Sequence, residues 1–471
     1  MSGQSIAAPR ARMFFGHPLG LAYLSFTETW ERFSFYGMQA LLLLYMVDRA
    51  LTPAHAGDVL GLAGFKSGLE AVFGPLSTEA LGSQIFGLYT GLVYFTPLFG
   101  GLLGDRVLGQ RRTVMLGAVL MAIGHLLMAF DAALLIALAF LVVGCGCLKG
   151  NISAQVGQLY ARGDDRRSHA FSVFNVGINI GVFVAPLVCG TLGETLGWAW
   201  GFGAAAVGMV FGLAIYVAGG KYLPPDTVRR RGEGAPRPKL RAGDWRVILA
   251  LTAMLALGIL FNIAYGQESN VFSLWARDTL DRRIFGWTMP VTWFQALDGA
   301  FVVGFTPLAL RIWAAQAARR REPSDLGKIA IGSVMGMLGM GVLAVASWLF
   351  ARGVPVGAGW GVACFALFGL GFIYQWPTSL ALVSRAAPAS INSTMMGVAF
   401  FSAFVANYLV GWLGGFYEKM TPTDFWLMHA ALSGAGAVLT WLCLKPLNRV
   451  LLPQHALADE TPAAEALAET T

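Results

Sequence analysis

The sequence predicts an all-α protein that crosses a membrane many times. Of its 471 residues, 56% are hydrophobic and only 13% are charged, whereas soluble domains carry about 25% charged residues. The mean hydropathy is +0.62. A membrane-spanning helix needs about 20 mainly apolar residues, so the chain has room for about a dozen spans joined by short connections. Backbone groups in lipid must be hydrogen-bonded internally, which requires helices.

Apolar runs between charged residues or Pro/Gly breaks predict twelve spans, six in each half of the chain. In the first half they cover residues 19–47, 81–104, 114–130, 133–152, 170–192 and 200–217. In the second half they cover residues 245–275, 291–314, 329–350, 360–383, 393–413 and 425–444. Two six-helix halves fit a duplicated architecture whose halves enclose a site at the membrane midplane.

This pattern predicts five regions. They are an N-terminal segment (1–16), a six-helix bundle (17–220), a linker (221–244), a second six-helix bundle (245–446) and a tail (447–471). The linker is rich in Pro and Gly and carries Arg229, Arg230, Arg231, Arg237, Lys239 and Arg241. The tail is rich in Ala, Glu and Thr and carries no motif, so we expect it to be disordered.

The arginines and lysines gather in alternate loops. Besides the linker, basic residues lie in the loops around residues 106–112, 162–167 and 319–328, while the opposite loops are poorer apart from Arg277, Arg282 and Arg283. The positive-inside rule therefore predicts a multi-pass protein of the cytoplasmic (inner) membrane with both termini in the cytoplasm. The net charge of +7 follows from this topology, so we expect no nucleic-acid partner.

The first predicted span contains three ionisable residues that share one helical face. Glu28 is followed by Glu31 at i+3 and by Arg32 at i+4. A charge near the bilayer centre costs about 2.5 to 3.5 kcal/mol on insertion scales, so such residues pair internally and indicate function. Lys149, in the apolar fourth span, is the natural further partner. The alternative is an ion network that only fixes helix packing.

Other polar residues in the predicted spans are less informative. Glu268 and Asp298 are either functional residues or helix-end residues that lie close to water. His125 is the one histidine in mid-span, where a packed, hydrogen-bonded role is the more common. The five cysteines lie in apolar segments without the spacing of a metal site, so we expect no metal and no cofactor.

The loop between the second and third spans has the pattern G-x-x-x-D-R-x-x-G-x-R-R, formed by Gly101, Asp105, Arg106, Gly109, Arg111 and Arg112. It resembles the cytoplasmic loop signature of the major facilitator superfamily. In that superfamily the glycines permit a tight helix connection, and the Asp and Arg residues latch neighbouring helices.

Several motifs together resemble the proton-dependent oligopeptide transporter (POT/PTR) family of that superfamily, over nearly the whole chain. They lie at residues 28–38 (E-x-x-E-R-F-S-F-Y-G-M), 148–153, 171–181, 281–287 and 393–398. The resemblance implies the twelve-helix major facilitator fold and a non-enzymatic symporter that imports di- and tripeptides with protons. It implies proton-coupling roles for Glu28, Glu31, Arg32 and Lys149, and a pocket lined by Tyr36, Tyr89 and Asn179. We expect the protein to work as a monomer.

The sequence also departs from the family. The tenth-helix glutamate that receives the peptide's amino group falls at Phe372, and the eleventh-helix tryptophan that walls the pocket falls at Ala399. A basic residue of the first helix falls at Gln39, and a seventh-helix glutamate falls at Gly266. Our hypothesis is that Glu268 or Asp298 replaces the amine contact or takes a proton. The candidate substrate-binding residues are Tyr36, Gln39, Tyr89, Asn179, Glu268, Asn270, Asp298, Phe372, Ala399 and Ser402.

We considered three other classes of function. The altered pocket also fits a transporter-like sensor that binds without transport, or a proton-coupled carrier of a non-peptide substrate. A membrane enzyme has no support, because the sequence contains no G-x-S-x-G or H-E-x-x-H motif.

Overall fold

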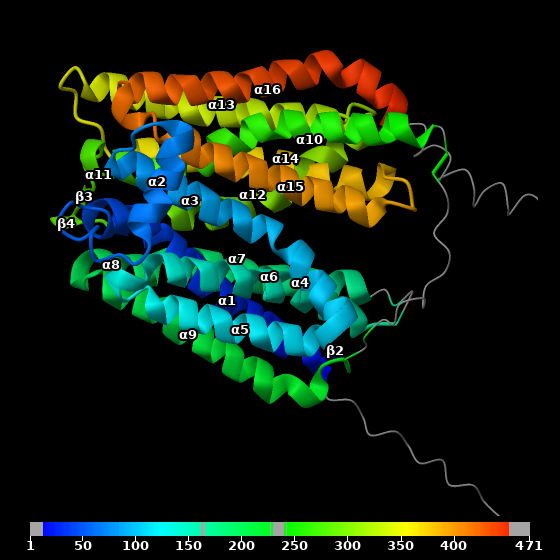
Figure 1. Cartoon of the computed structure of the whole chain (residues 1–471). Coiled ribbons are helices and arrows are strands. Elements are labelled where there is room, and N and C mark those ends of the chain that lie inside the picture. Colours follow the sequence, from blue (N-terminus) through cyan, green and yellow to red (C-terminus); the bar gives the residue numbers. More distant parts are fainter. Residues whose placement is uncertain are drawn as a thin grey trace, which may run out of the picture. The chain divides into compact units, whose positions relative to one another are not determined.

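A computed structural model of the chain describes residues 13–161, 164, 166–226, 228, 240–241 and 243–451. Arg162, the linker residues 229–239 and the tail from 452 lie outside these residues, as do the first twelve residues. The described part is helical almost throughout, so the predicted all-α class is confirmed (Figure 1).

The structure forms two compact units. The first comprises the described residues of Met1–Gln39 and Thr96–Glu233, and the second those of Ala40–Phe95 and Gly234–Thr471. The first unit contains the start of α1 (Leu19–Tyr45), α4 (Pro97–Leu103), α5 (Gln110–Leu127), α6 (Leu134–Gln158), α7 (Arg166–Ala185), α8 (Thr191–Leu196) and α9 (Trp198–Gly219). The second contains α2 (Leu62–Phe73), α3 (Thr78–Phe95), α10 (Asp244–Gly266), α11 (Val271–Thr279), α12 (Trp293–Ala318), α13 (Asp325–Phe350), α14 (Gly359–Ala386), α15 (Asn392–Gly414) and α16 (Pro422–Leu451). The bounds of the two predicted bundles stay a prediction.

Each of the twelve predicted spans falls on one helix or on consecutive helical segments. Within the described residues, ten helical segments are long and apolar enough to cross a membrane. The other two predicted spans fall on α1 and α5, where charged residues lower the hydropathy: Glu28, Glu31 and Arg32 in α1, and Arg111 and Arg112 in α5. The total of twelve membrane spans stays a prediction.

Three small elements were not predicted. Helix α2 has only 12 residues, fewer than the about 20 that a membrane span needs, so the pattern of apolar spans does not reveal it. The strands β1 (Met13–Phe14) and β2 (His17–Pro18) form a hairpin, as do β3 (Arg283–Ile284) and β4 (Trp287–Thr288). In each hairpin both turn residues have positive φ, at Phe15 and Gly16 or at Phe285 and Gly286, which type I′ turns require.

Small residues allow close helix packing in the first unit. A Cβ on Gly117 of α5 would lie 2.6 Å from the carbonyl oxygen of Gly144 on α6, and one on Gly144 would lie 2.8 Å from the carbonyl oxygen of Gly117. Both helices therefore approach through bare backbone, as small residues permit in membranes. Helix α9 packs on the same α5.

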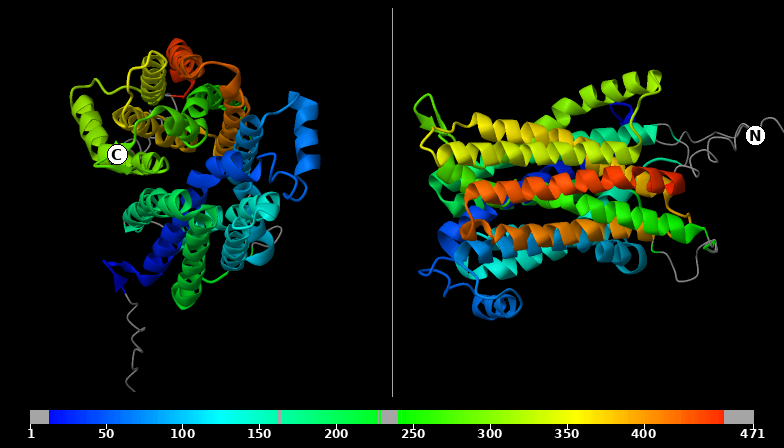
Figure 2. Two further views of the ribbon diagram at one scale, coloured as in Figure 1. Left: turned by 90° about the vertical axis from the view of Figure 1, so that its left-hand side faces the viewer. Right: turned by 90° about the horizontal axis from the view of Figure 1, so that it is seen from above.

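The second unit has an aromatic core. Helix α13 packs against α14 and α16, and α10 packs against α15 and α16 (Figures 1 and 2). Helix α3 packs against α15, where a Cβ on Gly87 would lie 2.6 Å from the backbone nitrogen of Gly411. Trp275, Phe294, Phe365 and other buried aromatic side chains fill the space between these helices.

Candidate functional site

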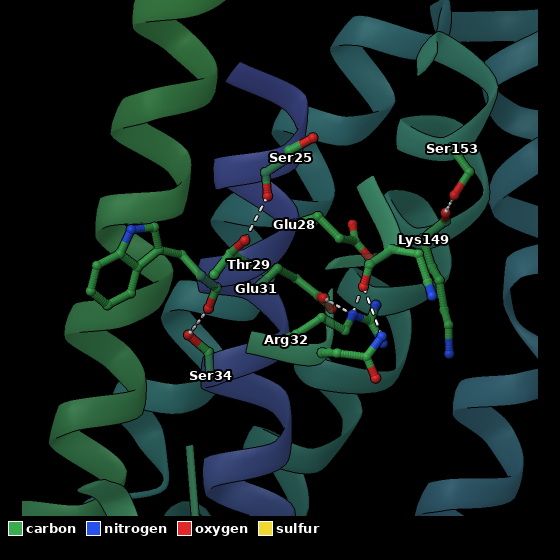
Figure 3. A network of polar contacts seen from close by, with 11 residues as sticks. Ser25, Glu28, Thr29, Glu31, Arg32, Ser34, Lys149 and Ser153 are labelled. Carbon is green, nitrogen blue, oxygen red and sulfur yellow. Dashed lines mark hydrogen bonds and ion pairs between the residues drawn. The ribbon is translucent and has the colours of Figure 1, made fainter. Parts of the chain in front are cut away.

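Helix α1 carries a buried cluster of three charged side chains. Glu28, Glu31 and Arg32 are 3%, 0% and 3% exposed. The Nε atom of Arg32 lies 3.0 Å from Oε1 of Glu28 and 2.5 Å from Oε2 of Glu31. The i, i+3 and i+4 spacing therefore places both carboxylates against one guanidinium, as the sequence predicts (Figure 3).

Lys149 reaches this cluster from α6. Its side chain is half-buried and interacts electrostatically with Glu31. Figure 3 shows Lys149 beside the α1 residues, with Ser153 one helical turn further along α6. The four side chains that were grouped from the sequence lie together, and two acids with two bases leave the cluster neutral when all are ionised. Their role in proton coupling stays a prediction.

Helix α7 fixes the position of this face of α1. A Cβ on Gly181 would lie 2.5 Å from the carbonyl oxygen of Thr29 and 2.8 Å from Cβ of Arg32. A Cβ on Gly177 would lie 2.7 Å from Oγ1 of Thr29. Only glycine fits at these two positions without displacing α1. The 171–181 motif therefore has a physical role in supporting the charged cluster.

The cluster can act as a switch because its two acids share one guanidinium. A proton on either acid would remove one of the two ion pairs and leave positive charge uncompensated. The arrangement can therefore convert protonation into a free cation, which is suited to binding a carboxylate.

The loop signature bonds to the segment that follows α9 in the first unit. Gly101 lies in α4, Asp105 and Arg106 lie in a π-helical turn at Gly104–Leu108, and Gly109 has a φ of +84°. Arg111 donates from its backbone N–H to Oδ1 of Asp226 at 2.6 Å and from Nη2 to the carbonyl of Gly220 at 2.7 Å. These two bonds tie the start of α5 to the segment that follows α9, and the gating role of the loop stays a prediction.

The second unit contains two further buried acids. Glu268 lies in the break between α10 and α11 and is only 7% exposed. It therefore does not lie at the water-exposed surface of the second unit. Asp298 lies within the second turn of α12 and is half-buried. The hydroxyl of Tyr265 donates to Oδ1 of Asp298 at 2.9 Å. The sequence reasoning missed Tyr265, because its partner Asp298 lies 33 residues away on another helix.

No group of three or more His, Cys, Asp or Glu side chains in the described residues could hold a metal ion. The five cysteines are free, and four of them are buried. His125 is fully buried on α5, which agrees with a packed role, and its ring nitrogens have no hydrogen-bond partner among the described residues.

Comparison with known proteins decides the family. The family model described as the POT family matches residues 111–227 and 239–428 of this chain. The chain belongs to the POT family. A peptide transporter of Yersinia enterocolitica is 31% identical to this POT chain, over 95% of the chain and 98% of the relative. A di-/tripeptide transporter of Lactococcus lactis is 28% identical, over 93% of the chain and 98% of the relative.

A solved structure confirms the fold of this POT chain. The crystal structure of a POT peptide transporter in complex with sulfate is 28% identical, covers 94% of this chain and 97% of its own, and has a TM-score of 0.81. The chain is therefore a multi-pass membrane transporter of the major facilitator fold. The predicted family is also confirmed.

The remaining candidate pocket residues of the POT chain fall in both units. Tyr36 and Gln39 on α1 and Asn179 on α7 are half-buried in the first unit, and Asn179 donates to the carbonyl of Asn175 at 2.8 Å. Tyr89 lies on α3 of the second unit and is 3% exposed. Their substrate contacts stay predictions.

The positions where this chain departs from the POT pattern are packed. Phe372 on α14 stacks on Tyr265, with ring centroids 5.6 Å apart. Ala399 on α15 is fully buried in a hydrophobic cluster of the second unit, and the hydroxyl of Ser402 donates to the carbonyl of Ala399 at 2.7 Å. In this structure Ala399 therefore faces packed side chains.

Asn270 lies in a buried polar network of the second unit. Its Nδ2 donates to Oγ of Ser83 at 2.8 Å and to Oε1 of Gln267 at 3.1 Å. Nε2 of Gln267 donates to the carbonyl of Val410 at 3.0 Å and contacts Nε2 of His429 at 3.1 Å. The network joins the α10–α11 break to α3, α15 and α16. The amide donor of Asn270 is thus used within the protein.

Proposed function

We propose that this POT chain is a proton-coupled symporter that imports short peptides, either di- and tripeptides or modified peptides, by alternating access. The observation that carries the proposal is the buried cluster of Glu28, Glu31, Arg32 and Lys149. Relatives named as peptide transporters and di-/tripeptide transporters support the substrate class.

The cluster supplies the coupling. In the state that faces outward it takes a proton, one ion pair of Arg32 loosens, and Arg32 or Lys149 becomes free to bind the substrate carboxylate. Binding then favours closure, because a ligand shifts two conformations only by its differential affinity for them. Release of the proton to the opposite side restores the ion pairs and lets the substrate go.

The pocket has to receive the other end of the peptide without the acid that the family resemblance places at Phe372. Glu268 and Asp298 are the candidates for the amine contact. A charge-assisted hydrogen bond of this kind is worth about 1.5 to 3 kcal/mol. The changed pocket favours modified peptides as well as ordinary ones.

The location follows from the charge pattern. We place the chain in the cytoplasmic (inner) membrane with both termini in the cytoplasm, since the described arginines of the 106–112 and 319–321 loops then lie inside. It works as a monomer, needs no cofactor and no enzymatic step, and takes its energy from the proton gradient.

Flux into proteoliposomes tests the proposal. With a pH gradient that is acidic outside, the purified wild-type protein is expected to accumulate a radiolabelled dipeptide above its external concentration. A protonophore is expected to abolish accumulation while leaving counterflow between preloaded and external peptide. Equilibration without accumulation would contradict proton coupling.

The replacement of the pocket acid by Phe372 favours a second candidate, a sensor that binds peptides without moving them. A thermal-shift screen of di-, tri- and modified peptides identifies ligands, because a ligand stabilises the state it binds. A ligand that stabilises the protein but shows neither counterflow nor accumulation would support the sensor.

A further inference from the structure

An apolar groove lies between α13 and α14 of the second unit, where α14 begins. It is lined by Val342 of α13, by Gly357 in the connection before α14, and by Gly359, Trp360 and Ala363 of α14. Its volume is about 390 Å³, within the range of about 300 to 1,000 Å³ that is usual for ligand sites. None of the five lining residues is charged, so the groove suits an apolar ligand.

Two glycines leave one wall of the groove open. A Cβ on Gly357 or on Gly359 would meet no atom within 4 Å. Neither glycine has a positive φ, so neither the backbone conformation nor the packing requires glycine there. The space beside them is therefore available to a ligand, and a larger side chain could fill it without a clash.

The groove continues the lipid-facing side of two membrane spans. Both α13 and α14 are long and apolar enough to cross a membrane. Leu338 and Val345 lie one turn before and one turn after Val342 on the same face of α13, and both are exposed. Val362, next to Ala363 on α14, is exposed as well. Apolar side chains that a membrane span exposes face hydrocarbon, so lipid chains reach the groove directly.

Two arginines lie on the segments that meet at the end of the groove. Arg352 is in the connection between α13 and α14, and its guanidinium carbon lies 3.4 Å from the ring centre of Trp348. The base of the β3–β4 hairpin joins the same connection, because the backbone N–H of Asp281 donates to the carbonyl of Val356 at 2.7 Å. Arg283 of this hairpin pairs with Asp281 at 3.1 Å.

The charge of these two segments complements a phosphate. The hairpin and the connection carry three arginines, Arg282, Arg283 and Arg352, against one acid, Asp281, which leaves a net charge of +2. Arg352 is exposed and has no ion pair among the described residues. A guanidinium can donate two parallel hydrogen bonds to a phosphate.

The tip of the β3–β4 hairpin indicates where the membrane surface lies. Phe285 at the tip is fully exposed and has a φ of +50°, which is unfavourable for an aromatic residue. Packing within the described chain does not compensate this cost, because the side chain is exposed. Ile284 and Trp287 beside it are exposed too. Aromatic side chains gather at the membrane–water interface, so we expect the hairpin and its arginines at the level of the lipid headgroups.

We propose that the groove and the adjoining arginines bind one phospholipid. An acyl chain lies along Val342, Trp360 and Ala363, and the phosphate binds to Arg352 and Arg283. The apolar groove and the positive charge at its end match the two parts of this ligand. The site goes beyond the proposed symport and does not depend on it, because it uses no residue of the α1 cluster.

Native mass spectrometry of the delipidated full chain tests the site. We expect the wild type to bind one dioleoylphosphatidylglycerol about ten-fold more tightly than dioleoylglycerol, which has the same chains without the phosphate. Gly359→Leu fills the groove and should weaken the tightest binding of both lipids about ten-fold. Arg352→Gln should remove the preference for the phosphate. Gly203→Leu on α9, where a Cβ also meets nothing within 4 Å, is the matched control and should bind as the wild type does.

Three results would overturn the proposal. Unchanged binding of both lipids by Gly359→Leu would exclude the groove, and Gly357→Leu replaces this variant should it fail to fold. Equal affinity of the wild type for the two lipids would exclude the phosphate contact. A wild-type dimer that Gly359→Leu abolishes would show that a second copy of the chain covers the groove. These measurements contain no peptide and no pH gradient, so they are independent of the outcome of the uptake experiments.

Discussion

Oε2 of Glu31 lies 2.5 Å from Nε of Arg32, and neither side chain is more than 4% exposed. A buried ion pair contributes little net stability, because desolvation of the two charges offsets their attraction. Its loss leaves an uncompensated buried charge, which is strongly unfavourable. The pair is thus suited to respond to a proton with a change of structure.

Gly109 should tolerate substitution far less than Gly101. Gly109 has a φ of +84° and a ψ of 154°, a region that essentially only glycine adopts, and a Cβ there would lie 2.6 Å from Cγ of Asp226. Gly109→Ala should cost about 1 to 3 kcal/mol and lower Tm by several degrees. Gly101→Ala, where a Cβ meets nothing within 4 Å, is the matched control. Equal Tm values for the two variants in detergent would contradict the latch geometry.

Asn270 should matter for stability more than Asn407. The amide of Asn270 joins two buried side chains of the second unit, whereas Nδ2 of Asn407 donates only to the carbonyl of Ala403 in its own helix. Asn270→Ala should cost about 1 to 3 kcal/mol because buried polar partners lose their bonds. Asn407→Ala should change Tm little. Thermal unfolding checks the pair, and a larger loss for Asn407→Ala would refute the prediction.

The ion pair of Asp164 with Arg166 should give a small, pH-dependent stabilisation. Side-chain and backbone hydrogen bonds from Arg166 hold the pKa of the Asp164 carboxyl below its usual value. A lowered folded pKa means that the unfolded chain binds the proton more tightly. The stabilisation is therefore complete above the usual pKa of aspartate, about 4, and is lost as the pH falls through the lower folded value.

Asp164→Asn should therefore lower Tm slightly at neutral pH, and the difference from wild type should vanish in acid. Arg166 also bonds to the carbonyl of Gly16, so the aspartate is the cleaner residue to change. A Tm difference that stays constant from neutral to acidic pH would show that Asp164 acts through packing.

The positions of the membrane helices could be predicted from the sequence, because a lipid bilayer restricts the length and composition of the segments that cross it. All twelve apolar stretches fall on helices, since each needs only length, low charge and a polar break. Helix α2 was not predicted because its 12 residues are too few for a membrane span. The span at 245–275 was predicted as continuous, but it breaks at Gln267–Asn270, where two amides bond to α3, α15 and α16.

The candidate site was predictable only where its parts are close in sequence. Glu28, Glu31 and Arg32 were grouped by helical spacing, and Lys149 by its isolation in an apolar span. Tyr265 was missed because its partner Asp298 is 33 residues away, on another helix. Such contacts depend on helix packing, which local patterns do not encode.

Uptake by Lys149→Ala in proteoliposomes tests the central claim most directly. Without this cation the α1 cluster keeps one base for two acids, so protonation no longer controls the switch. We predict that peptide uptake driven by an imposed pH gradient falls by about ten-fold or more, which is about 1.4 kcal/mol, while counterflow is retained. Lys66→Ala, a partly exposed lysine on α2, is the control and should behave as wild type. Undiminished uptake by Lys149→Ala under the pH gradient would contradict the account.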